Sequence, residues 1–214
     1  MESTSSVVKP TRRPGGRTAE VTKRVNDAVL GLLVEGGVAA CTFSAVADRA
    51  DIERSTLYRR YSDRWAMLID AIIDYARNLA SPVRLGSFRD DLRFLLHRAV
   101  EILSTPAGPS LWAAGAALRA GSAPEHRERF WQSRRSQIFP VVEAAKARGE
   151  MAANVDPIQL FAFALGAIHF RMLIIGERVD SKTIDQIVDD VCRLYCRPAG
   201  SVEMKAPVAA AEIE

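Results

Sequence analysis

A run of arginine, hydroxyl and tyrosine side chains between Arg54 and Arg64 has the residue types and spacing that suit binding of a polyanion. It reads R-S-T-L-Y-R-R-Y-S-D-R. Guanidinium groups bind phosphate oxygens and guanine edges in a bidentate manner, and hydroxyl groups reach phosphate oxygens. A solvated basic helix face that covers two core tyrosines would have the same composition. The run alone therefore does not decide between the two interpretations.

The other reactive side chains form no catalytic or metal-binding pattern. Three histidines lie on separate predicted helices: His97, His126 and His169. The sequence lacks the H-x-x-x-H, G-x-S-x-G and phosphate-binding glycine patterns. The carboxylates of Asp90-Asp91 and of Asp189-Asp190 are sequence neighbours, so the two members of each pair point to different helix faces. We therefore expect neither enzyme activity nor a bound metal ion or cofactor.

Three cysteines, Cys41, Cys192 and Cys196, are too few and too scattered for a disulfide framework or a four-ligand zinc site. Cys192 and Cys196 are four residues apart, a spacing that can place both on one helix face. A redox sensor is thus an alternative to the ordinary interpretation of free cysteines as small buried apolar groups.

The stretch from Thr42 to Leu68 predicts the elements that would hold the basic run outward. Two short helical stripes of apolar residues are separated by a polar turn that contains Asp51. The stripes consist of Phe43, Val46, Ala47, Ala50 and Ile52, then Leu57, Tyr58 and Tyr61. We expect Ser44 to cap the first helix and Ser55 the second. A helix of about two turns stabilises itself poorly, so its neighbours must hold it in place.

The same stretch resembles the DNA-binding domain of the tetracycline-repressor (TetR) family of bacterial transcription regulators. The resemblance is carried by Thr42, Ala47, Ala50, Ile52, Ser55-Thr56-Leu57-Tyr58, Tyr61, Arg64 and Leu68. One departure is Asp51, where the family usually has glycine. Asp tolerates a left-handed backbone better than most residues, so we expect the turn to survive. The resemblance implies a helix-turn-helix that reads duplex DNA and a small-molecule effector bound among the later helices.

Residue roles follow from position on this motif. On the second helix, the expected base or phosphate contacts are Arg54, Thr56, Tyr58, Arg59 and Arg60, with Ser55 at the cap. Orientation on the DNA backbone is expected from Thr42, Ser44, Tyr61 and Arg64. Aromatic and polar candidates for the effector site are Trp112, Trp131, Phe161, His169 and Arg171.

Charge placement supports this assignment. The 214 residues carry a net charge of +3. Through Arg64 there are 11 Lys and Arg against 8 Asp and Glu, and the other 150 residues have 18 of each, so the excess lies in the part with the helix-turn-helix. We see no uninterrupted apolar run of the roughly 18 residues that a membrane span needs, and no apolar signal core at the start. We therefore expect a cytoplasmic protein without a membrane partner.

The whole chain is predicted to be all-α, with about nine helices and no alternating stretch typical of a sheet. We expect a disordered basic arm at residues 1–17, a DNA-binding domain at 18–62, a helical ligand-binding and dimerisation domain at 63–197, and a disordered tail at 198–214. The first helix should run from Thr18 to Glu35 before Gly36-Gly37. A fourth helix, capped by Asp63, would act as a lever on the DNA-reading surface.

Later helix boundaries are expected near Ser87 to Ser104, Ser110 to Ala120, Pro124 to Arg148 with a bend or division at Pro140, Pro157 to Ile175, and Ser181 to the residue before Pro198. The last two of these helices are more apolar than a small bundle needs. They predict a symmetric four-helix contact between two subunits, with an internal core of a monomer as the alternative.

The sequence as a whole predicts a homodimeric transcription regulator. It would bind a near-palindromic duplex operator and act as a repressor released by an unidentified small molecule. A helical enzyme and an interaction protein that does not bind DNA are the alternatives.

Overall fold

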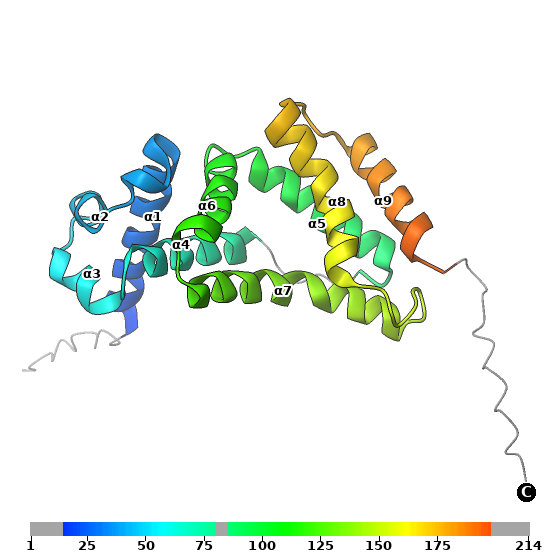
Figure 1. Ribbon diagram of the computed structural model, residues 1–214, viewed down its shortest axis with the longest axis horizontal. Coiled ribbons are helices and arrows are strands. Elements are labelled where there is room, and N and C mark those ends of the chain that lie inside the picture. The colour runs from blue at the N-terminus through cyan, green and yellow to red at the C-terminus, as the bar shows by residue number, and fades with distance from the viewer. Residues whose placement is uncertain (1–14, 80–84, 198–214) are drawn as a thin grey trace, which may run out of the picture. The chain divides into compact units, whose positions relative to one another are not determined.

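The computed structural model describes residues 15–79 and 85–197, and this part of the chain is helical without a β-strand (Figure 1). In chain order the helices are α1 (Gly15–Ala40), α2 (Phe43–Ala50), α3 (Arg54–Arg60), α4 (Arg64–Leu79), α5 (Phe88–Leu103), α6 (Gly108–Gly121), α7 (Pro124–Ala147), α8 (Pro157–His169) with a π-helical continuation η1 (Phe170–Ile175), and α9 (Ser181–Tyr195). The predicted fold class is confirmed.

The described residues fall into two compact units. The first takes in residues 15–79 and 100–135, and the second residues 85–99 and 136–197. The division between these units does not coincide with the predicted boundary between residues 62 and 63. That boundary was drawn between a DNA-binding domain and a ligand-binding and dimerisation domain, and it stays a prediction. The expected basic arm and C-terminal tail lie outside the described residues, apart from residues 15–17, which already belong to α1.

α1 begins at Gly15, earlier than predicted, so Thr18 lies inside the helix and does not cap it. The Thr22 hydroxyl donates to the Thr18 carbonyl at 2.7 Å, a contact across one helical turn. A kink marks the predicted end, because Gly36 (φ −143°) and Gly37 (φ 64°) leave the helical region, and a short helical stretch then continues to Ala40. Gly37 has the left-handed backbone that glycine adopts without steric cost.

The core of the first unit lies where α1, α2, α3 and α4 meet. Its fully buried side chains include Val29, Val46, Leu57 and Leu68. Burial of such apolar side chains is the main force that holds a helix as short as α3 in place.

Capping differs from the prediction at α2 and α3. Thr42 caps α2, with its Oγ1 accepting the N–H of Ala45 at 3.1 Å, so Ser44 lies one residue inside the helix. α3 begins at Arg54 after Glu53, whose side chain makes no capping bond, so Ser55 is likewise inside. Asp63 caps α4 as predicted: its Oδ1 accepts the N–H groups of Trp65 at 2.8 Å and Ala66 at 3.0 Å.

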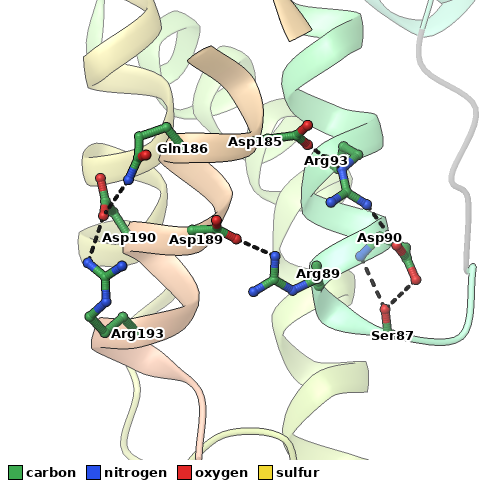
Figure 2. Close-up of polar contacts among 9 residues, drawn as sticks. All are labelled: Ser87, Arg89, Asp90, Arg93, Asp185, Gln186, Asp189, Asp190 and Arg193. Carbon is green, nitrogen blue, oxygen red and sulfur yellow. Dashed lines mark hydrogen bonds and ion pairs between the residues drawn. The ribbon is translucent and has the colours of Figure 1, made fainter. Parts of the chain in front are cut away.

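In the second unit, α5 packs against α9, and two ion pairs join them: Arg89 with Asp189 and Arg93 with Asp185 (Figure 2). Ser87 caps α5 at the predicted start of this helix. The Ser87 hydroxyl accepts the Asp90 N–H at 3.2 Å and donates to the Asp90 carboxylate at 2.6 Å. The apolar interior includes Phe88, Leu92, Leu160, Ile168, Ile184 and Val188.

Two expectations for the later helices need correction. α7 runs from Pro124 to Ala147, so the expected division at Pro140 is wrong, and the alternative of a bend there stays a prediction. Pro140 is on its exposed side, where water can replace the missing backbone hydrogen bond. Among the described residues, one helix, Pro157–Ile175, is long and apolar enough to cross a membrane by length and composition, with 19 residues and a mean hydropathy of 1.9. The sequence shows no uninterrupted apolar run there, because Gln159, His169 and Arg171 interrupt the pattern.

Candidate nucleic-acid interface

The turn between α2 and α3 is set by the backbone of Asp51. This residue is left-handed (φ 52°, ψ 57°), and its N–H closes the end of α2 on the carbonyls of Ala47 and Asp48. It has the only positive φ of any non-glycine residue among those described. Arg24 of α1 donates to the Asp51 carbonyl at 3.1 Å. The expectation that Asp would support this turn in place of glycine is confirmed.

Two side chains anchor α3 from below. Leu57 is fully buried, and Tyr61, directly after the helix, is 5% exposed. Both pack into the core that α1, α2 and α4 form. Because these anchors occupy the inner side of a seven-residue helix, the remaining positions face outward.

The outward face of α3 is basic and aromatic. Arg54, Ser55, Arg59 and Arg60 are exposed, and Thr56 is half-buried. Tyr58 is 67% exposed. Its ring and the Phe43 ring of α2 pack in a T-shaped arrangement, with centroids 4.8 Å apart. This contact restricts the tyrosine ring and leaves most of the side chain accessible.

The arginines of this surface have no carboxylate partner among the residues that the structure describes. Arg54 instead donates to the Ser44 hydroxyl. Arg60 lies over the Tyr61 ring and Arg64 over the Trp65 ring, 5.5 Å and 5.0 Å from the centroids. Guanidinium groups without a neutralising acid, on one exposed face, attract a phosphate backbone.

Tyr61 is the predicted site residue that the structure removes from this surface. Its hydroxyl is buried and has no hydrogen-bond partner among the described residues. Burial raises the pKa of that hydroxyl. The expectation that Tyr61 contacts the DNA backbone is therefore wrong, because its ring is needed to fill the core beneath α3.

Asp63 links the end of the DNA-reading segment to a later helix of the same unit. While its Oδ1 caps α4, its Oδ2 lies 2.8 Å from Nε2 of His126, in the first turn of α7. Burial alone would raise the pKa of Asp63, but the Ala66 N–H and His126 outweigh it, so that pKa is lowered. Sequence reasoning missed the pair, because no local pattern connects residues that are 63 positions apart.

α4 has further contacts with α6 and α7 inside the first unit. Arg129 of α7 pairs with Asp70. A Cβ built on Gly121, at the end of α6, would come within 2.7 Å of the Trp65 ring. Glycine thus permits a close approach between the end of α6 and the start of α4.

The predicted effector-site residues divide between the two units. Trp112 and Trp131, in the first, are 43% and 37% exposed. In the second, Phe161 is buried, His169 is half-buried, and Arg171 pairs with Glu177 at 2.8 Å. A common role in binding a ligand stays a prediction for these residues.

Comparison with known proteins agrees with this geometry. Residues 27–71 match the model for bacterial regulatory proteins of the tetR family, and residues 82–191 match that for the tetracyclin repressor-like C-terminal domain. The chain belongs to the tetR family. The protein is therefore a DNA-binding transcription regulator with a helix-turn-helix.

Individual relatives show how far the similarity extends. The HTH-type transcriptional regulator YdeS of Bacillus subtilis is 28% identical over 174 residues, covering 78% of this chain and 85% of YdeS. AqdR of Rhodococcus erythropolis is 26% identical over 175 residues, covering 80% and 84%. Among solved structures, the TetR family transcription regulator SCO0332 is 25% identical with a TM-score of 0.64, covering 81% of this chain and 97% of that one. These relatives are transcription regulators.

Proposed function

We propose that this tetR-family protein is a homodimeric repressor that binds a near-palindromic operator and is released by a small molecule. The observation that carries the proposal is that the chain has two exposed surfaces of different chemistry. One is the exposed basic face of α3. The other, the apolar face of α8 and η1, is defined by Ile158, Ala162, Phe163, Gly166, Phe170 and Ile174, all exposed.

The apolar face suits a second copy of the chain. Only 22% of the apolar Pro157–Ile175 segment is buried within the chain. Phe163 and Phe170 are 53% and 56% exposed. A Cβ built on Gly166 would meet no atom within 4 Å, so the backbone there is open to close approach by another helix. An exposed apolar face of this kind is typical of an interface, and a two-fold axis would pair it with itself.

α9 continues this face and would contribute the second helix of the contact. Its Tyr195 ring meets Phe163 of α8, with centroids 6.2 Å apart, and the adjacent Leu194 is 61% exposed. Two helices from each subunit then form a four-helix contact. Burial in a dimer explains the apolar length of Pro157–Ile175 without a membrane, and a cytoplasmic location follows.

In such a dimer the two copies of α3 would enter successive major grooves, about 34 to 36 Å apart, and read a near-palindromic site. Arg59, Arg60 and Tyr58 have the exposure needed to reach base edges. Arg54, Ser55 and Thr56 lie at the start of α3, with Thr42, Ser44 and Arg64 at the flanks for phosphates.

Release would act through α4, which starts directly after the DNA-reading segment. The Asp63–His126 pair, the Arg129–Asp70 pair and the packing of Trp65 on Gly121 tie α4 to α6 and α7. A ligand that favours another position of these helices would lower DNA affinity by its differential binding energy, about 1 to 3 kcal/mol.

The experiment is a selection of bound sequences from a random duplex pool, repeated in the presence of candidate small molecules. The proposal predicts enrichment of a two-half-site sequence, and loss of binding with at least one ligand class. Enrichment of a single half-site would contradict the dimer. Indifference to every duplex at low salt would favour the interaction-protein alternative, and turnover of a ligand would favour the enzyme.

A further inference from the structure

Two thiols occupy the face of α9 that packs against α5. Asp185, Asp189, Cys192 and Cys196 follow one another at spacings of four, three and four residues, which places them on one side of the helix. Figure 2 shows Asp185 and Asp189 of this face reaching Arg93 and Arg89 of α5. The cysteines therefore continue the row of side chains beside Arg89.

The backbone brings the two cysteines within reach of a disulfide bond. The Cys196 N–H donates to the Cys192 carbonyl at 2.9 Å, the bond of an α-helical turn. Residues four apart in such a turn have Cα atoms about 6 Å apart, inside the range that disulfides span. Cys196 itself has an extended backbone (φ −88°, ψ 148°) and ends the helix. Ring closure therefore involves the terminal turn of α9 and the antiparallel bridge that pairs Cys196 with Met151.

Polar and charged neighbours divide the roles of the two thiols. The pKa of Cys192 is lowered to about 7, first by the hydrogen bond from the Cys196 thiol and then by Arg89, against burial and the charges of Asp189 and Glu150. The pKa of Cys196 is raised, because its proton is held in that hydrogen bond and the thiol is partly buried. Both side chains are half-buried, so a small reagent can reach them. Cys192 is then the attacking thiolate and Cys196 the resolving thiol.

We propose that Cys192 and Cys196 form a reversible redox site, which a hydroperoxide oxidises to an intrachain disulfide. The Cys192 thiolate attacks the terminal peroxide oxygen and the O–O bond breaks, which forms Cys192 sulfenic acid. The departing alkoxide, or hydroxide from hydrogen peroxide, takes a proton from solvent and leaves as an alcohol or water. Cys196 sulfur then attacks the sulfenic sulfur, its proton joins the departing hydroxide as water, and the S–S bond forms. Two thiols lose two electrons and the peroxide gains them.

Cys41 supplies an internal reference within the chain. It is fully buried in the first unit, and its Sγ lies 3.7 Å from the Val29 carbonyl oxygen and 3.6 Å from that of Gly37. Burial raises the pKa of Cys41 to about 11. At pH 7 the thiolate fraction of Cys41 is lower than that of Cys192 by about four decades. The greater nucleophilicity of the more basic Cys41 thiolate offsets part of this difference. We expect Cys192 to react about a hundredfold faster.

The experiment treats the reduced full-length chain with equimolar hydrogen peroxide and maps the thiols without reducing agent. Trypsin cleaves after Arg193, between the two cysteines, so the disulfide joins the peptide 183–193 to the peptide that begins at Leu194. We expect loss of two thiols per chain, this linked peptide pair, monomeric chain length on a non-reducing gel, and an unmodified Cys41. Oxidation no faster at Cys192 than at Cys41, or a cross-link between chains, would overturn the proposal.

Variants and pH separate a built site from a chance pair. Cys196→Ser should stop at a sulfenic acid on Cys192 that a diketone reagent traps, and Cys192→Ser should leave Cys196 unreacted, while Cys41→Ser behaves as the wild type. The reaction rate should rise about tenfold from pH 6 to pH 8 and then level off, and Arg89→Gln should move this midpoint upward. A rate that still climbs steeply above pH 8 would refute the activated thiolate. Circular dichroism checks that each variant keeps its helices.

Discussion

Replacement of Ile174 by aspartate should separate the two subunits while leaving each chain folded. Ile174 is 66% exposed on η1, so its replacement should change the folding stability of the isolated chain little. Full burial of an isoleucine side chain stabilises by about 2 to 3 kcal/mol, so covering two-thirds of it is worth about 1.5 kcal/mol. In a symmetric dimer each subunit contributes one Ile174, so this free energy is lost twice. The loss is then about 3 kcal/mol, or about a hundredfold in the dimer dissociation constant.

The introduced carboxylate would add to this loss, because an unpaired charge in an apolar contact is costly. Analytical ultracentrifugation across a concentration series measures the dissociation constant. Leu85→Asp is the matched control, because Leu85 precedes α5, is 52% exposed, and lies outside the proposed contact. We expect the control to stay within about threefold of the wild type. Equal dimer affinity for Ile174→Asp and the wild type, with unchanged helical content, would refute the assignment of this face.

Three further predictions concern the first unit. Arg59→Ala should weaken operator binding by about 1 to 3 kcal/mol and relax preference at one base position, while Arg119→Ala, on α6, should not; equal weakening on specific and random DNA would show a phosphate contact only. Tyr61→Phe should leave DNA affinity unchanged and cost no stability in chemical denaturation, because the hydroxyl that it removes is buried without a partner; a tenfold loss of DNA affinity would restore Tyr61 to the interface. The lowered pKa of Asp63 gives stability that is present above its unfolded-state pKa and is lost as the pH falls through the folded value. Asp63→Asn keeps a capping oxygen but no charge, so its unfolding free energy should fall less than that of the wild type below about pH 4; parallel curves would contradict the role of the charge in the His126 contact.

Many helix ends and the turn at Asp51 could be predicted from residues close to them in the sequence. Asp63 was assigned as a cap from its side chain and the residues that follow it, and helix starts were placed near Ser87 and Pro157. In the structure Asp63, Ser87 and Asp156 cap these three helices. The left-handed Asp51 could be predicted because its place between two apolar stripes required a tight turn. Each of these features is decided within a few residues of sequence.

Features that depend on packing were less predictable. Thr42 and Ser44 are both good capping residues, and the start of α2 selects the first of them. A tyrosine such as Tyr61 can lie in a core or on a surface. Packing against α1 and α4 places Tyr61 in the core. The Asp63–His126 contact arises only when α7 packs beside the start of α4. The apolar continuity of Pro157–Ile175 is a property of the formed helix, which an interrupted sequence run conceals.

The most direct test of the central claim is a methylation-interference footprint on the selected operator. Guanine N7 is exposed in the major groove, where the arginines of α3 should bind. A dimer that reads DNA with α3 should give two patches of interference related by a dyad, about 10 base pairs apart or a multiple of that spacing, with one guanine lost from each patch in Arg59→Ala. A single patch, or a footprint that Arg59→Ala leaves unchanged along with affinity, would contradict it.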